Sequence, residues 1–131
     1  MSADDISGAQ PSFDAWLDEI KASPEAAGIG MYLMHNGVVR GSARDGSAVT
    51  GMDLSYDAER LEGIKAEISA RPGVIALRAW VNEGRLAVGD DIMRVLIGGD
   101  IRENVFGSLQ EFVRLVKTEC VREWEMRGEE S

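Results

Sequence analysis

The chain has 131 residues, of which 44% are hydrophobic and 28% charged, and its formal net charge is −9. This length suits one domain with its own core, so we expect a single domain over residues 12–131 behind a disordered tail over residues 1–11. The acidic balance argues against a nucleic-acid partner, which selects for basic surfaces. No hydrophobic run reaches the roughly 18 residues of a membrane span, and the N-terminus lacks the apolar segment of a signal peptide. The sequence therefore predicts a cytoplasmic protein with no membrane partner.

Hydrophobic periodicity and turn residues divide the chain into helices and strands. In chain order, the expected elements are a helix over residues 13–20, strands over 28–40 and 52–56, a helix over 57–70, strands over 74–82 and 92–97, and a helix over 101–126. Ser12 and Asp57 are candidate N-caps of the first two helices, and Asp100 with Glu103 is a candidate capping box for the third. Residues 41–51, rich in glycine and serine, form a loop. This order predicts an α+β domain with a mainly antiparallel sheet and packed helices.

The single cysteine and the single histidine limit the possible chemistry. One thiol excludes an intrachain disulfide, and neither residue type is numerous enough for a multi-cysteine or multi-histidine metal site. Cys120 falls on the hydrophobic stripe of the last predicted helix, so we expect a buried, unreactive thiol. His35 precedes Asn36-Gly37, a dipeptide that favours an exposed hairpin turn. The sequence predicts no metal and no cofactor.

Lys117 lies near the hydrophobic stripe of the last predicted helix, with Phe106, Val113 and Trp124 as its angular neighbours. Two interpretations stay open. In one, the side chain runs along apolar surface and its ammonium reaches water. In the other, the amine is partly desolvated and acts as a nucleophile or a proton carrier.

Arg102 is expected in the first turn of the same helix. There the side chain, the backbone N–H groups and the helix dipole can together hold a phosphate or a carboxylate, and Gly98-Gly99 provides backbone freedom just before that turn. The alternative is a surface arginine that pairs with Glu103 or Asp100.

Two further arginines flank the loop over residues 41–51. Arg40 ends the preceding strand and Arg44 lies within the loop. Arginines beside a glycine-rich loop suit the capture of an anion, and the alternative is a solvated loop edge. The sequence contains no phosphate-binding loop, dinucleotide fingerprint or nucleophile elbow.

These residues belong to four segments that resemble, in the same order, motifs of the large catalytic subunit of molybdopterin synthase. The resemblance extends over residues 28–124. The segments are Gly37-Val38-Val39-Arg40, Leu54-Ser55-Tyr56 with the helix that follows, Glu83-Gly84-Arg85-Leu86-Ala87-Val88-Gly89-Asp90, and Arg102 and Phe106 with Lys117-Thr118. The family implies the same α+β class, with a fold of the α/β-hammerhead type.

The resemblance also implies a role in molybdenum cofactor biosynthesis. In that family, sulfur arrives as a thiocarboxylate on the C-terminal Gly-Gly tail of a ubiquitin-like small subunit. It is transferred to a cyclic pyranopterin phosphate, which becomes the molybdopterin dithiolene. Large subunits pair as a homodimer within a heterotetramer. By resemblance, Arg40 and Arg102 contact the phosphate or pterin, and Lys117 is the catalytic residue where the thiocarboxylate meets the substrate.

The sequence differs from the family pattern before the last helix and after Lys117-Thr118, where Val121-Arg122-Glu123-Trp124-Glu125 replaces a Pro-x-Trp-Lys segment and has its tryptophan one residue late. Ile101 stands where the family has a histidine, and Glu125 falls where a second lysine is expected. Arg122 is a candidate for the missing charge and joins Arg44 among the candidate substrate-binding residues. The alternative function is a non-catalytic homologue that binds a ubiquitin-like Gly-Gly tail or a pterin-like anion.

Overall fold

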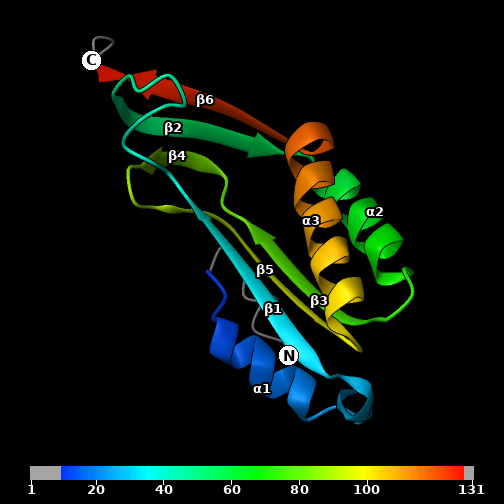
Figure 1. Ribbon diagram of the computed structural model, residues 1–131. Coiled ribbons are helices and arrows are strands. Elements are labelled where there is room, and N and C mark those ends of the chain that lie inside the picture. Colours follow the sequence, from blue (N-terminus) through cyan, green and yellow to red (C-terminus); the bar gives the residue numbers. More distant parts are fainter. Residues whose placement is uncertain (1–9, 129–131) are drawn as a thin grey trace.

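The computed structural model describes residues 10–128, which form two three-stranded antiparallel sheets with helices packed against them (Figure 1). In chain order, the elements are α1 (Phe13–Lys21), the 3-10 helix η2 (Pro24–Gly28), β1 (Met31–Val38), β2 (Val49–Tyr56), α2 (Ala58–Ser69), β3 (Val74–Val81), β4 (Gly84–Ala87), β5 (Asp91–Gly99), α3 (Arg102–Glu119) and β6 (Val121–Arg127). The strand orders are β1-β5-β3 and β4-β2-β6. The expected α+β class with antiparallel pairing is confirmed. Residues 1–9 of the expected tail lie outside the described residues.

Local side-chain caps start the first two helices. The Ser12 hydroxyl accepts a hydrogen bond from the Ala15 backbone N–H at 3.2 Å, and the Asp57 carboxylate accepts one from the Arg60 backbone N–H at 3.0 Å. Each bond satisfies a backbone donor that the first helical turn leaves without a partner. Both expected N-caps are confirmed.

The third helix begins differently. Its N-cap is Ile101, which makes no side-chain cap bond. The Asp100 carboxylate instead accepts from the Ile101 backbone N–H at 2.6 Å and from the Asn104 amide at 2.9 Å. The expected capping box between Asp100 and Glu103 is therefore wrong, because Asp100 stands one residue before the N-cap.

The C-terminal strand β6 is the largest difference from the expected elements. A helix was expected over residues 101–126, but α3 ends at Glu119, and Cys120 has φ −121° and ψ −44°. The chain then reverses, and β6 pairs antiparallel with β2. This pairing gives the segment backbone hydrogen-bond partners on β2 and overrides its helical propensity. Lys117 and Trp124 consequently lie on different elements.

The expected hairpin at Asn36-Gly37 is also wrong. Both residues lie inside β1, opposite Arg94 and Met93 of β5. The Asn36 amide donates to the Asp91 carboxylate at 2.9 Å. The turn-forming tendency of the dipeptide is local, whereas β1 pairs with β5 along its whole length.

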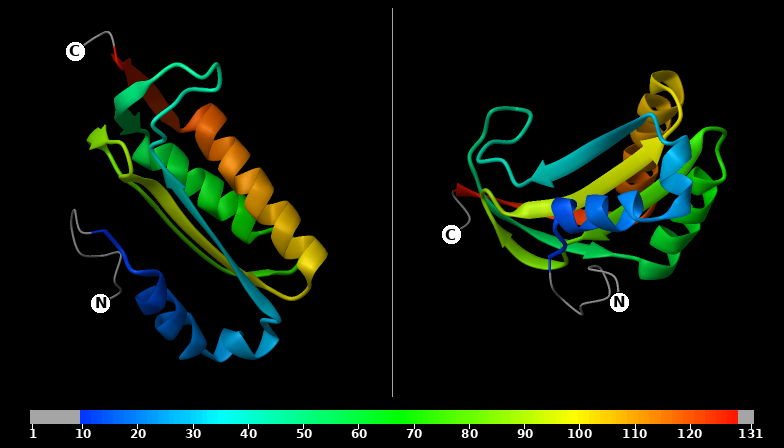
Figure 2. Two further views of the ribbon diagram at one scale, coloured as in Figure 1. Left: turned by 60° about the vertical axis from the view of Figure 1, so that its left-hand side comes forward. Right: turned by 90° about the horizontal axis from the view of Figure 1, so that it is seen from below.

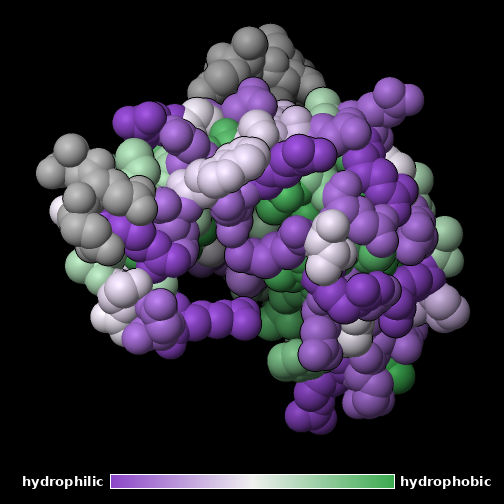
Figure 3. Space-filling model, turned by 90° about the horizontal axis from the view of Figure 1, so that it is seen from above, coloured by the Kyte–Doolittle hydropathy of each residue, from purple (hydrophilic) through white to green (hydrophobic). Residues whose placement is uncertain are grey.

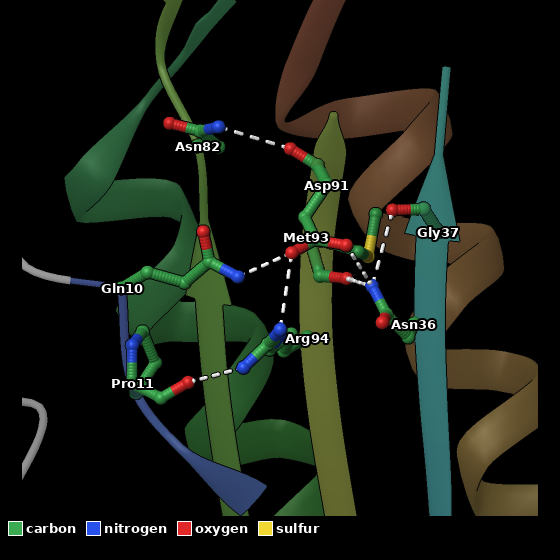
Figure 4. A network of polar contacts seen from close by, with 8 residues as sticks. All are labelled: Gln10, Pro11, Asn36, Gly37, Asn82, Asp91, Met93 and Arg94. Carbon is green, nitrogen blue, oxygen red and sulfur yellow. Dashed lines mark hydrogen bonds and ion pairs between the residues drawn. The ribbon is translucent and has the colours of Figure 1, made fainter. Parts of the chain in front are cut away.

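Asp91 is the centre of a polar network that ties the segment before α1 to the sheet (Figure 4). Its carboxylate accepts from the amides of Asn36 and Gln10 and from the Arg94 guanidinium. Arg94 also donates to the Pro11 carbonyl at 2.6 Å. These bonds, led by the one from Asn36, hold the pKa of Asp91 below its ordinary value of 3.8.

The helices cover both faces of the β1-β5-β3 sheet, with α1 on one side and α2 and α3 on the other (Figure 2). The larger core lies under α2 and α3, and the smaller one joins Trp16 and Ile20 of α1 to Leu96. Cys120 belongs to the larger core, and burial raises the pKa of its thiol above 9.0, which confirms a buried thiol. Within residues 10–128, no helix combines the length and apolar character that a membrane crossing requires.

Candidate functional site

An open cleft of about 870 Å³ lies where the β1–β2 connection, β2, β6 and the C-terminal end of α3 meet. Figure 3 views the molecule from this end and shows hydrophilic side chains around a hollow with hydrophobic residues inside it. The lining residues are Val38, Arg40, Ala43, Arg44, Asp45, Met52, Ile92, Lys117, Glu123, Trp124, Glu125 and Arg127. Four of them are cationic and three are carboxylates. The cleft is therefore locally basic on a protein whose net charge is −9.

The β1–β2 connection places Arg40 and Arg44 in the cleft. Val39 is buried in the larger core, which anchors the connection directly before Arg40. Backbone bonds then close the loop, from Ala43 N–H to the Ser47 carbonyl and from Val49 N–H to the Gly41 carbonyl. Among residues 10–128, no carboxylate forms an ion pair with Arg40 or Arg44. Both guanidinium groups are thus available to an anionic ligand.

Lys117 reaches the cleft from the last turn of α3. Its Nζ lies 3.6 Å from Oε2 of Glu123, and the side chain is 47% exposed. Glu123 faces the cleft because it stands opposite Leu54 in the β2–β6 ladder, and Leu54 is buried on that face. The reversal of the chain after α3 therefore brings an amine and a carboxylate together at the cleft wall.

The strand β6 also ties down the loop on the far side of the cleft. Arg127 pairs with Glu125 at 3.1 Å and donates to the Ser47 hydroxyl at 2.8 Å. Ser47 in turn donates to the Asp45 carboxylate through its hydroxyl at 2.7 Å and its backbone N–H at 3.0 Å. Chiefly through these bonds, and with a smaller contribution from Arg127, the pKa of Asp45 falls below 3.8.

His35 is a residue near this site that the sequence interpretation placed wrongly in an exposed turn. It is half-buried on β1, and its Nε2 is buried without a hydrogen-bond partner among the described residues. Burial, and secondarily the charge of Lys117, lowers its pKa below 6.5. The alternation of a strand could have indicated this placement, because His35 shares a face with Met31 and Leu33, which pack against the larger core.

The cleft contains Arg40, Arg44 and Lys117 but not the other two predicted site residues. Arg102 is exposed in the first turn of α3, fifteen residues (102 to 117) and roughly 22 Å of helix from Lys117. Arg122 lies on β6 directly before Glu123 but does not line the cleft. Within one chain, these two arginines do not join the three cations that line the cleft.

The fold and the cleft together define an α+β protein with an open cleft lined by Arg40, Arg44 and Lys117. The chain belongs to the MoaE protein family, because the model of that family matches residues 9–119. This membership confirms the resemblance and places the chain in molybdenum cofactor biosynthesis. Among curated protein sequences, none matches it.

Several solved structures share the fold at low sequence identity. Molybdopterin synthase from Staphylococcus aureus is 16% identical, with a TM-score of 0.68 over 83% of this chain and 80% of that chain. The molybdopterin biosynthesis MoaE protein from Burkholderia ambifaria MC40-6 is 24% identical, with a TM-score of 0.67 over 89% and 79%. The complex of subunits 1 and 2 of the molybdopterin-converting factor from Helicobacter pylori 26695 is 16% identical, with a TM-score of 0.64 over 88% of this chain and 78% of that chain.

Proposed function

We propose that this protein is the large subunit of a molybdopterin synthase. It would transfer sulfur from the C-terminal thiocarboxylate of a ubiquitin-like small subunit to a cyclic pyranopterin phosphate and so form the dithiolene. The observation that supports this proposal is the meeting of Arg40, Arg44 and Lys117 in one cleft. The two-subunit complex from Helicobacter pylori supports a small-subunit partner.

Arg40 and Arg44 bind the substrate phosphate in this proposal. A guanidinium group can donate two parallel hydrogen bonds to phosphate oxygens, which fixes orientation as well as position. Neither arginine has a carboxylate partner among the described residues. An incoming phosphate therefore displaces no existing ion pair at these two side chains.

Lys117 acts where the thiocarboxylate tail meets the substrate. In each transfer, the sulfur bonds to a side-chain carbon of the substrate as a C–O bond of that carbon breaks, and the displaced oxygen takes a proton or stays on the phosphate. Water then cleaves the bond between that sulfur and the carbonyl carbon of the tail. The tail then leaves as a carboxylate, and two transfers supply the two dithiolene sulfurs. The Lys117 ammonium stabilises negative charge on the attacked carbonyl oxygen and exchanges a proton with the reacting groups.

Arg102 and Arg122 remain proposed substrate contacts only as contributions of a second copy. Each lies away from the cleft of its own chain. A two-fold dimer of the kind implied by the family resemblance can bring the first turn of α3 from one copy to the cleft of the other.

One observation favours the alternative of a non-catalytic homologue. The amine of Lys117 is already paired with Glu123, so the residue that should react is partly neutralised. In that case, the cleft would hold a Gly-Gly tail or a pterin-like anion without transferring sulfur.

Reconstitution with a thiocarboxylated small subunit and the cyclic pyranopterin phosphate tests the proposal. We expect the intact protein to form the dithiolene. Lys117→Ala should lower the rate of dithiolene formation at least about a hundredfold, and Lys65→Ala should leave that rate unchanged. Lys65 is a matched control because it lies on α2 and pairs with Glu62 outside the cleft. No dithiolene from the intact protein, together with retained binding of the small subunit, would favour the non-catalytic alternative.

A further inference from the structure

Charged side chains of β6 face the cleft at every second residue. Glu123, Glu125 and Arg127 line the cleft and lie two residues apart, as one face of a strand requires. Glu123 pairs with Lys117 at 3.6 Å, and Glu125 pairs with Arg127 at 3.1 Å. On this side of the cleft, the two cations, Lys117 of α3 and Arg127 of β6, are therefore each paired with a carboxylate of β6.

The opposite wall differs in this respect. Among the described residues, Arg40 and Arg44 form no ion pair. A simple anion that enters the cleft therefore meets two cations without an ion pair on the β1–β2 side, where Asp45 is the carboxylate that also lines the cleft. On the β6 side, it has to compete with a carboxylate that the fold already holds beside each cation.

The pair between Lys117 and Glu123 lies at the rim of the cleft, where both residues are exposed as a whole and only the carboxylate side chain is partly shielded. The Glu123 side chain is only 25% exposed, although that of Lys117 is 47% exposed. A partly buried pair is screened less by salt than a pair at the open surface. The β2–β6 ladder also fixes the backbone of Glu123, so pairing with Lys117 costs side-chain freedom but no further ordering of this segment's backbone.

We propose that Glu123 is a specificity-determining residue of the cleft, because its carboxylate occupies the position on Lys117 that an anion would take. A simple anion binds at Arg40 and Arg44 and leaves the pair intact. A ligand anchored at the arginines displaces Glu123 only if it also offers hydrogen-bond donors to the released carboxylate. A phosphate ester that carries a ring with N–H groups meets both requirements. The inference rests on the proposed function only for this ligand class.

The family match does not include this residue, since it ends at Glu119. Glu123 exerts its effect in the cleft through Lys117, which lies inside the match. Removing the carboxylate should therefore open Lys117 to simple anions, and the effect should depend on Lys117 being present. This dependence separates a specific pair from a general change of charge.

Binding of inorganic phosphate, measured by calorimetry, tests the inference on the full chain. We expect Glu123→Gln to bind phosphate roughly fivefold more tightly than the unchanged protein. Glu123→Asp, which keeps the charge but shortens the side chain, should give a smaller gain. Glu59→Gln is the charge-matched control, because Glu59 is exposed in the first turn of α2 outside the cleft, and it should leave the affinity unchanged.

The same substitution in a Lys117→Met background completes the test. We expect Glu123→Gln to add less than about twofold there, since the cation that it releases is missing. An equal gain with and without Lys117, or no gain from Glu123→Gln in either background, overturns the inference. The measurement needs neither a small subunit nor turnover, so its result is independent of whether sulfur transfer occurs.

Discussion

Arg102 and Lys117 occupy opposite ends of α3, with Arg102 in its first turn and Lys117 in its last. Fifteen residues of helix (102 to 117) separate them by roughly 22 Å along the axis. Lys117 lines the cleft and Arg102 does not. If both residues serve one substrate, the two side chains have to come from different copies of the chain.

Mixing two inactive variants tests this arrangement. In a symmetric dimer, a hybrid of Lys117→Ala and Arg102→Ala contains one site with both residues intact and one site with neither. Random pairing makes about half of the dimers hybrid, so about a quarter of the sites should recover sulfur-transfer activity. No recovery on mixing, with exchange of subunits verified by mass spectrometry, would contradict the shared site.

Replacement of Arg40 should weaken substrate binding more than it weakens folding. Arg40→Ala removes a charge-assisted bond to the phosphate, and we expect KM to rise roughly tenfold with little change in the free energy of unfolding. Arg85→Ala is the control, because Arg85 is exposed and pairs with Asp53 outside the cleft. Equal effects of the two variants on KM would show that the phosphate does not bind at Arg40.

His35 can report the charge of Lys117, because it is the only histidine of the chain. Its imidazole resonances in an NMR titration should have a midpoint below the ordinary 6.5, since burial and then Lys117 lower its pKa. Lys117→Met should raise the midpoint without restoring 6.5, because burial is the larger cause. A midpoint at or above 6.5 in the unchanged protein would contradict the buried position of this side chain.

The same shift has a consequence for stability. Because the folded pKa of His35 lies below the unfolded value, the unfolded chain binds more protons between the two values. The free energy of unfolding should therefore have its full contribution from His35 above about pH 6.5 and lose it as the pH falls through the folded pKa. In urea titrations from pH 7.5 to 5, His35→Gln should remove this part of the pH dependence. An unchanged profile would contradict the assignment.

Gly99 is required for close packing and not for backbone freedom, contrary to the sequence interpretation of Gly98-Gly99. Neither residue has positive φ, and a Cβ on Gly99 would lie 2.5 Å from the Gly73 carbonyl oxygen. We expect Gly99→Ala to cost about 1–3 kcal/mol in the free energy of unfolding. Gly63→Ala, in the exposed middle of α2, should instead stabilise by about 0.5–1 kcal/mol. Chemical denaturation measures both effects. An unchanged free energy of unfolding for Gly99→Ala would show that the backbone around Gly73 can shift to accommodate the added methyl group.

Elements with a local signal were predictable from the sequence. The helices α1 and α2 each combine a capping side chain, Ser12 or Asp57, with hydrophobic residues at helical spacing. The strand β6 was not predictable in this way, because residues 121–127 contain good helix formers and follow α3 without a glycine or a proline. Their structure is decided by the edge of β2, which is distant in sequence.

The residues of the candidate site likewise include some that were predictable from the sequence and one that was not. Arg40, Arg44 and Lys117 could be selected from their residue types, their segments and the family resemblance, and the cleft contains all three. Glu123 could not be selected, since a continuous helix over residues 101–126 does not turn it back toward Lys117. The role of a carboxylate in this cleft depends on the chain reversal at Cys120, which only tertiary pairing specifies.

A crystal structure of the protein with the cyclic pyranopterin phosphate bound tests most directly whether this cleft is the substrate site. The account predicts phosphate oxygens at roughly 3 Å from the guanidinium groups of Arg40 and Arg44, with Lys117 beside the substrate carbons that receive sulfur. Phosphate density elsewhere on the molecule, with the cleft left empty, would contradict it.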